Sequence, residues 1–196
     1  MYYKLNKDFY RRSYYENVDF SRNIDYSSLC KLNGFHTFPQ YEYSIILNAI
    51  QQLNFNIKKV IDFGCGTGLL LDYIVKRYKT PLSPYGIDFL EESIFLAKQL
   101  FAKFEDNFIL ANAAYIESIN LNFRDSIILL DPYHYKKTDL IRMITYIKRF
   151  ESPILLYTYS DVLNSTEIGS IEFFISGLDI PLLYNYKHEL IQIIVI

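Results

Sequence analysis

The sequence has few cysteines, and none at metal-binding spacing. Its two cysteines, Cys30 and Cys65, stand far apart, and no cluster of histidines accompanies them. Zinc sites and disulfide frameworks need several cysteines at short, regular spacings. We therefore expect no metal site and no disulfide framework, which suits a protein of a reducing compartment.

Long apolar runs and a strong charge of one sign are also missing. The formal net charge is -2, so no overall basic field favours a nucleic-acid or membrane partner. The charged start of the chain lacks the apolar core of a signal peptide, and no run approaches the ~18 apolar residues of a membrane span. We expect a cytoplasmic protein without a membrane partner, and short basic runs leave a nucleic-acid partner open but not favoured.

What is present is typical of a globular protein with one core. Of the 196 residues, 51% are hydrophobic and 21% are charged, which is too apolar for intrinsic disorder. We expect one domain in two parts. Residues 1–57 form an N-terminal cap segment, and residues 58–196 carry the main fold.

From residue 57 onward, short β-rich apolar runs alternate with helical stretches. This pattern is typical of a parallel sheet covered by helices. The expected strands span 58–63, 85–88, 108–111, 126–130 and 153–159, and the expected helices span 69–78, 91–103 and 138–150. The sequence therefore predicts an α/β fold with a doubly wound, mostly parallel sheet.

Two more apolar runs, at 171–175 and 187–196, follow the fifth expected strand. They lie too close together, with no helical pattern between them, for a parallel crossover. We interpret them as an antiparallel C-terminal pair that brings the sheet to seven strands.

The first 57 residues show no such alternation. Twelve of the first 43 residues are Tyr or Phe, and residues 40–53 have the pattern of an amphipathic helix. This helical and aromatic segment is expected to cap a site. A coding sequence rich in A and T would explain the aromatic count equally well.

The most informative stretch is VIDFGCGTGLLL, residues 60–71, in which Gly64, Gly66 and Gly68 stand between an expected strand and an expected helix. Such a turn lets the backbone approach a ligand closely. A phosphate-binding P-loop would need Gly-Lys-Ser/Thr at its end, and that is absent. A dinucleotide site is closer, but Asp62 would repel its pyrophosphate. A cationic ligand fits better.

A second motif, Gly86-Ile-Asp88, ends the second expected strand. An acid at that place can accept hydrogen bonds from both hydroxyls of a ribose. Asp88 therefore selects a nucleoside without selecting a reaction. The alternative is that its carboxylate only caps the helix that follows.

Together, Asp62-Phe-Gly-Cys-Gly-Thr-Gly68 and Gly86-Ile-Asp88 resemble the glycine and ribose motifs of class I S-adenosylmethionine-dependent methyltransferases. The resemblance covers residues 58–159. It implies that Asp62 faces the ammonium of the cofactor, that the loop makes room for its methionine part, that Asp88 binds the ribose and that Phe89 lies against adenine. The implied cofactor-binding set is Asp62, Gly64, Cys65, Gly66, Thr67, Gly68, Asp88, Phe89, Asn112, Ala113 and Asp131.

The adenine position of that family follows the third strand, where many members have an acid and then a small residue. Here Asn112 and Ala113 stand at that place. The carbonyl oxygen of Asn112 can accept the hydrogen bond of the adenine amino group. The alternative is that Asn112 caps a helix that begins near Ala113.

The fourth expected strand ends in Asp131-Pro-Tyr-His-Tyr135, and doubly wound sheets place their reacting groups at this end. Asp131, His134 and Tyr135 are the candidate catalytic residues. Amino methyltransferases carry an Asp/Asn-Pro-Pro-aromatic tetrad here, of which only Asp131 and Pro132 match. This half match keeps nitrogen methylation open and puts base methylation in doubt.

A second resemblance, to a group of small bacterial class I methyltransferases, begins with Asn33-Gly-Phe-His-Thr-Phe-Pro-Gln-Tyr41 and continues to Asp-Pro-Tyr and Leu155-Leu-Tyr-Thr-Tyr159. It implies that Phe38 and Tyr41 close over the site. Tyr133, which follows Asp131-Pro132, is a further expected substrate contact. For Phe38 and Tyr41, plain packing against the following helix is an equal alternative.

The expected function is therefore methyl transfer from S-adenosylmethionine to a small molecule or a protein side chain. Three alternatives stay open. They are a nucleic-acid base N-methyltransferase, a non-catalytic protein that binds S-adenosylmethionine or a partner, and a nicotinamide oxidoreductase.

Overall fold

The computed structural model describes residues 30, 31, 33, 39–159, 171–176, 178, 180–187 and 191–196. The cap segment expected over residues 1–57 thus lies largely outside the described residues. Within the described part of the chain, no helix is long and apolar enough to cross a membrane.

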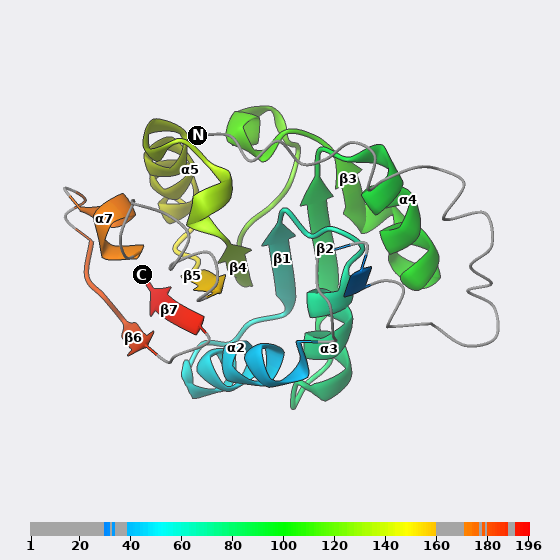
Figure 1. Ribbon diagram of the computed structural model, residues 1–196, viewed down its shortest axis with the longest axis horizontal. Helices are drawn as coiled ribbons and strands as arrows, with labels where there is room; N and C mark the ends of the chain where they lie inside the picture. The colour runs from blue at the N-terminus through cyan, green and yellow to red at the C-terminus, as the bar shows by residue number, and fades with distance from the viewer. Residues whose placement is uncertain are drawn as a thin grey trace.

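The seven described strands form one mixed sheet, in the order β3-β2-β1-β4-β5-β7-β6 (Figure 1). Strands β1 to β5 run parallel, β7 is antiparallel to β5, and β6 is antiparallel to β7. The fold class expected from the sequence is confirmed. The strands are β1 (Lys59–Phe63), β2 (Ser83–Asp88), β3 (Phe108–Leu110), β4 (Ser126–Leu130), β5 (Ile154–Tyr159), β6 (Tyr184–Lys187) and β7 (Ile191–Val195).

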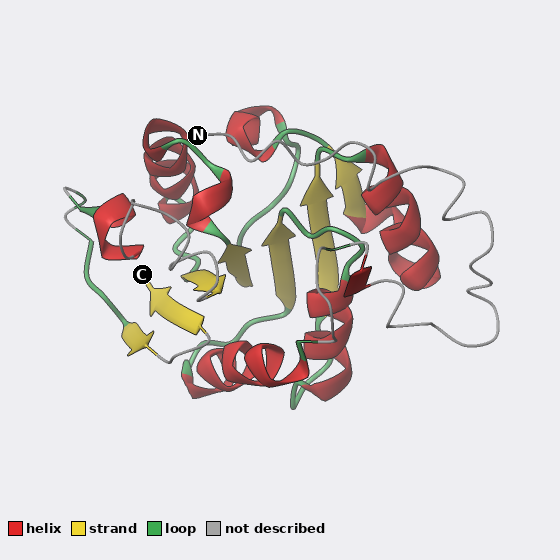
Figure 2. Ribbon diagram, in the orientation of Figure 1, coloured by secondary structure: helices red, strands yellow, loops and turns green. Residues whose placement is uncertain are grey.

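Helices cover both faces of the sheet, as Figure 2 shows in red around the yellow strands. Figure 1 shows α2 and α3 on one side of the strands and α5 on the other. The helices are α2 (Gln40–Gln52), α3 (Leu69–Arg77), α4 (Glu91–Leu100), α5 (Lys137–Lys148) and α7 (Ile171–Ile175), with 3-10 helices η3 (Ala102–Asn107), η4 (Ala113–Ser118) and η5 (Pro132–His134).

The core has two parts because the sheet is buried on both faces. Alternate residues of each strand point to opposite faces, so Val60 packs with α2, α3 and α4, whereas Ile61 packs with η4 and α5. All five residues of β4 are buried. This continuous apolar run is what a central parallel strand requires.

The C-terminal pair is antiparallel as expected, but the expectation for residues 171–175 is wrong. That segment is the helix α7, the sixth strand is Tyr184–Lys187, and the last strand begins at Ile191. The helix depends on a tertiary contact. The Ile171 amide donates to Gln192 Oε1 at 3.0 Å, and Gln192 Nε2 donates to Glu172 Oε2 at 2.8 Å. This contact from β7 overrides the strand propensity of Ile-Glu-Phe-Phe-Ile.

The strand order fixes where a ligand can bind. From β1 the chain proceeds outward to β2 and β3 on one side, and then returns to β4 and β5 on the other. In open parallel sheets, the crevice at the carboxyl ends of the strands at this reversal is the usual binding site. The segments that follow β1, β2, β3 and β4 are therefore the ones that can line it.

Candidate functional site

The glycine loop joins β1 to α3, and its three glycines have positive φ angles of 81°, 51° and 82° at Gly64, Gly66 and Gly68. Residues that carry a side chain rarely adopt this backbone conformation. A Cβ at Gly66 would lie 2.7 Å from Asn33 Oδ1, and one at Gly68 would lie 3.0 Å from Phe101 Cε2. At Gly64 a Cβ would meet no atom of the described residues within 4 Å. Of the three glycines, Gly64 presents the open side of the loop.

The loop does not offer its amides to an anion. All five backbone N–H groups of residues 64–68 donate hydrogen bonds within the protein. Phosphate-binding loops instead point free N–H groups at the ligand. The acceptors are the Ile87 carbonyl for Gly64 and Cys65 (2.8 and 3.2 Å), Asp88 Oδ2 for Gly66 (2.9 Å), Asn33 Oδ1 for Thr67 (3.2 Å) and the Cys65 carbonyl for Gly68 (2.9 Å).

Asn33 is a site residue that the motif analysis did not identify. Its carboxamide oxygen accepts the Thr67 amide proton, so the residue holds the glycine loop from the N-terminal side. The residue opens the segment that carried the second resemblance, but no spacing rule marked it. Only the fold brings residues 33 and 67 together.

Asp62, the last but one residue of β1, is the unusual group of the site. Its side chain is 1% exposed, and its Oδ1 atom has no hydrogen-bond partner among the described residues. Burial and then the nearby charge of Asp88 raise the pKa of Asp62 to about 8, against a partial offset from His134. A buried carboxylate without a partner is costly, and such a perturbed acid is a candidate for ligand binding.

Asp88 ends β2 and faces the glycine loop. Its Oδ2 accepts the Gly66 amide proton at 2.9 Å, and its Oδ1 accepts the Leu90 amide proton at 2.9 Å. Burial raises the pKa of Asp88, and these two hydrogen bonds oppose the rise. Leu90 immediately precedes α4 (Glu91–Leu100), and α4 has no side-chain cap hydrogen bond, so the carboxylate orders the turn before the helix and does not cap it. A carboxylate has about four acceptor positions, so each oxygen can still accept a hydroxyl proton.

Asp131 and His134 form an ion pair at the carboxyl end of β4. Asp131 Oδ2 lies 3.4 Å from His134 Nε2, and Asp131 Oδ1 accepts the Tyr133 amide proton at 3.0 Å. The aspartate is buried, whereas the histidine side chain is 63% exposed. The charge of Asp131 raises the pKa of His134. The structure thus brings two of the three candidate catalytic residues together.

The two tyrosines around His134 differ in their surroundings. Burial and then the charges of Asp88, Asp62 and Asp131 raise the pKa of Tyr135, so its hydroxyl shares the environment of the site carboxylates. Both tyrosines pack against the core on the α5 and α7 side, but the causes that raise the pKa of Tyr133 include neither Asp62 nor Asp88. Burial, Asp131 and Glu172 raise its pKa to about 12. Tyr135 therefore belongs to the cluster, and Tyr133 lies at its edge.

The expected adenine residues follow β2 and β3. Phe89 is 60% exposed, and Ala113 is buried at the start of η4. Asn112 caps η4, because its Oδ1 accepts the Ala114 amide proton at 3.0 Å. The capping alternative for Asn112 is thus confirmed, and one acceptor position of Oδ1 is used for it.

The other loop residues point into the protein. Cys65 is buried, and its Sγ atom would lie 2.7 Å from a Cβ at Gly86. Thr67 is 1% exposed, and its Oγ1 has no partner among the described residues. Of the expected substrate contacts, Tyr41 is 53% exposed on α2, and Phe38 lies outside the described residues.

Three further phenols, two buried and one partly buried, feel the charge of the carboxylates. Burial comes first among the causes that raise the pKa of Tyr43 on α2 and of Tyr157 and Tyr159 on β5, and the charge of Asp62 contributes in all three. No three Asp, Glu, His or Cys side chains within the described ranges are grouped so that they could hold a metal ion.

Known proteins of similar fold are numerous. A methyltransferase from Leishmania major that depends on S-adenosylmethionine (SAM) has a TM-score of 0.64 at 13% identity, over 93% of this chain and 80% of that one. One from Aquifex aeolicus has a TM-score of 0.60 at 14% identity, over 88% and 98%. Magnesium protoporphyrin IX methyltransferase from Synechocystis, crystallised with bound SAM, has a TM-score of 0.54 at 16% identity, over 98% and 90%. The chain spans only 47% of a plantazolicin methyltransferase that it also matches.

No curated protein matches the sequence significantly. A family model does match. The model described as a methyltransferase domain aligns with residues 35–163, more than half of the chain and all the elements from α2 to β5. The chain therefore belongs to the methyltransferase domain family, with the fold of class I S-adenosylmethionine-dependent methyltransferases.

Proposed function

We propose that this protein transfers the methyl group of S-adenosylmethionine to a proton-bearing nucleophile on a small molecule or a protein side chain. The observation that carries the proposal is Asp62, a buried acid with one oxygen that has no partner among the described residues, beside a loop whose amides are all occupied. That combination suits a cationic nucleoside and opposes a pyrophosphate. A nicotinamide oxidoreductase is accordingly disfavoured.

The cofactor would lie across the carboxyl ends of β1, β2 and β3. Asp62 would face its ammonium, Asp88 would accept the ribose hydroxyls, and Phe89 with Asn112 and Ala113 would border adenine. Gly64 would give the methionine part its closest approach to the backbone. Each of these positions lies at or just after the carboxyl end of one of three adjacent parallel strands.

The acceptor would then meet the methyl group on the other side of β1, beside β4 and β5. Asp131, His134 and Tyr135 follow β4, and the phenols of Tyr157 and Tyr159 belong to β5. This half of the site holds the chemistry for proton transfer. When bound, S-adenosylmethionine supplies a methyl group on a positively charged sulfur.

His134 would take the proton that the nucleophile loses. Its Nε2 faces Asp131, which leaves Nδ1 as the nitrogen that accepts a proton when the ring is neutral. Asp131 holds the ring and stabilises the imidazolium that forms. Positioning supplies the rest of the rate in a displacement of this kind.

The charges of the site argue against a phosphate-rich acceptor. Asp88 and Asp131 lie in it, Asp62 adds a further negative charge when it ionises, and the described group that lowers the pKa of both Asp62 and Asp88 by its charge is His134. A nucleic-acid backbone would meet repulsion there. A base N-methyltransferase therefore remains the weaker alternative.

Calorimetric titration with S-adenosylmethionine and S-adenosylhomocysteine tests the cofactor, and methyl label transferred to fractions of a cell extract tests the reaction. Binding of both ligands with label in one fraction is expected. Binding without label in any fraction would favour the non-catalytic alternative. No binding of either ligand would overturn the proposal.

Replacing Asp88 should weaken cofactor binding. We expect Asp88→Ala to lower the affinity for S-adenosylhomocysteine by about 1–3 kcal/mol, because ribose hydroxyls would lose their acceptor. Asp106→Ala, which removes an exposed acid of η3, is the matched control and should bind normally. Equal affinity of the two variants in calorimetry would place the ribose elsewhere. A melting curve checks that Asp88→Ala stays folded.

A further inference from the structure

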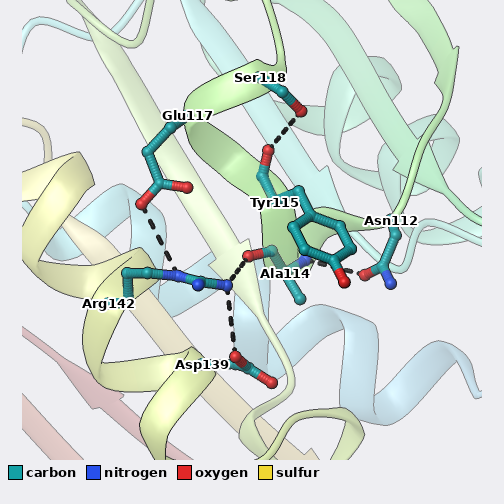
Figure 3. A network of polar contacts seen from close by, with 7 residues as sticks. All are labelled: Asn112, Ala114, Tyr115, Glu117, Ser118, Asp139 and Arg142. Carbon is teal, nitrogen blue, oxygen red and sulfur yellow. Dashed lines mark hydrogen bonds and ion pairs between the residues drawn. The ribbon is translucent and has the colours of Figure 1, made fainter.

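Arg142 of α5 reaches across to η4 and contacts it at two residues, while a third contact lies within α5 (Figure 3). Its Nη2 donates to the carbonyl oxygen of Ala114 and lies 3.3 Å from Asp139 Oδ1, and its Nε lies 3.7 Å from Glu117 Oε1. Arg142 therefore binds one backbone group and one acid of η4, while Asp139 on its own helix orients the guanidinium. Such forked contacts are a property of arginine that lysine cannot reproduce.

The peptide groups of Ala114 connect Arg142 to the expected adenine residue. The Ala114 carbonyl accepts from Arg142, and the Ala114 amide donates to Asn112 Oδ1 at 3.0 Å. Arg142, Ala114 and Asn112 are thus linked in one chain of contacts. An arginine that fixes Ala114 also fixes the oxygen of Asn112.

The neighbouring aromatic ring belongs to the same arrangement. The Tyr115 ring is 61% exposed, and the Arg142 Cζ atom lies 6.0 Å from its centroid. In the view of Figure 3, the ring lies between the guanidinium and Asn112. The Ser118 hydroxyl donates to the Tyr115 carbonyl at 2.8 Å within η4.

These contacts are poorly placed to stabilise the whole fold. The Arg142 side chain is 45% exposed and that of Glu117 is 44% exposed, and exposed ion pairs contribute little to the free energy of unfolding. Their geometric effect is local, on the segment that begins with Asn112. In addition, α5 starts two residues after Tyr135, so Arg142 ties the adenine segment to the helix that follows the catalytic segment.

We propose that Arg142 is a positioning residue for the cofactor, which fixes η4 so that Asn112 and Ala113 meet adenine. This assignment rests on the proposed function, because it requires that S-adenosylmethionine binds at the ends of β1 to β3. Arg142 touches neither reactant and acts through Ala114 and Asn112.

The test compares Arg142→Met and Arg142→Lys with Arg124→Met, which removes an exposed arginine just before β4. Affinity for S-adenosylhomocysteine and for adenosine is measured by calorimetry, and KM for S-adenosylmethionine and kcat are measured on the methylated extract fraction. We expect Arg142→Met to raise Kd and KM about tenfold with kcat and melting temperature nearly unchanged. Arg142→Lys should recover part of the loss, and Arg124→Met should bind as the wild type does.

A double-mutant cycle with Asn112→Ala tests the route of the effect. If Arg142 acts through Asn112, the double variant should lose little more affinity than Asn112→Ala alone. Fully additive losses would overturn the assignment. So would normal cofactor affinity of Arg142→Met, or a fall in its kcat with KM unchanged. If the wild type bound neither S-adenosylmethionine nor S-adenosylhomocysteine, the proposed function would fall as well, which distinguishes the two failures.

Discussion

Replacing His134 with alanine is expected to lower kcat by a factor of about 10²–10⁴, the usual contribution of a positioned general base. Its Nε2 lies 3.4 Å from Asp131, so the ring is oriented, and its exposure leaves it accessible to an acceptor. At a pH above the pKa of Asp62, the affinity for S-adenosylhomocysteine should change little, since the ring lies on the acceptor side of β1. The measurement is methyl label transferred to the extract fraction that the wild type methylates.

The pH profile separates a base from a mere contact. Asp131 raises the pKa of His134 above its ordinary value of 6.5. Because only the neutral ring accepts a proton, activity should fall as the pH falls through that raised pKa. Asp131→Asn keeps an oxygen for the Tyr133 amide but removes the charge, so it should shift the acidic limb to lower pH. The assignment of His134 as the base would be contradicted if Asp131→Asn had the same acidic limb in its pH–activity profile as the wild type. A normal kcat in His134→Ala would contradict it as well.

The parallel part of the fold could be predicted because its elements follow local rules. Strand β4 is a continuous apolar run between polar residues, and α5 carries its buried residues at helical spacing. Neither depends on a distant partner. The strand expected at residues 171–175 failed for the opposite reason, since α7 depends on Gln192, which is 20 residues or more away along the chain.

The candidate site divides in the same way. Asp62, Asp88 and Asp131 could be identified because each lies at or next to the carboxyl end of a parallel strand, where the fold itself brings polar residues to one crevice. Asn33 and Arg142 could not, because no spacing in the sequence relates either residue to the strand ends that it contacts. Short motifs identify residues that are expected to touch a ligand. The residues that hold these ligand contacts in place can be identified only from the tertiary structure.

The structure also changed the interpretation of the glycines. The expectation was that all three give room to a ligand. Gly66 and Gly68 instead accommodate Asn33 and Phe101, and only Gly64 of the three faces open space. The same loop geometry occupies the amides, which is why the charge of the ligand can be inferred from Asp62.

That inference leads to a large expected effect of pH on cofactor binding. The pKa of Asp62 is about 8 in the free protein, so at neutral pH the acid is mostly protonated and must lose its proton to pair with an ammonium. Affinity for S-adenosylhomocysteine should therefore fall towards a limit of about tenfold for each pH unit below that pKa, or about 50-fold in all between about pH 8 and about pH 6. An α-ammonium is itself largely protonated below about pH 8, so the ligand does not cancel the effect.

The matched variant is Asp62→Asn, which is nearly isosteric and cannot titrate. Its binding should be weak and independent of pH over the same range. In the wild type, the calorimetric enthalpy near neutral pH should vary with the ionisation enthalpy of the buffer, because close to one proton is released for each ligand bound. Equal wild-type affinity at both ends of the range would show that Asp62 is already ionised or does not meet the ligand.

Thermal unfolding gives an independent check, because the two effects of Asp62 have opposite signs. Its pKa in the folded protein is about 8, above the ordinary 3.8, so its contribution to the stability of the free protein is fully present below about pH 4 and is lost as the pH rises towards 8. Ligand binding reverses this, since the ionised acid then has a partner. The rise in melting temperature caused by S-adenosylhomocysteine should therefore grow with pH in the wild type and stay constant in Asp62→Asn. A rise that is constant in both proteins would mean that the buried oxygen of Asp62 serves the fold and not the cofactor.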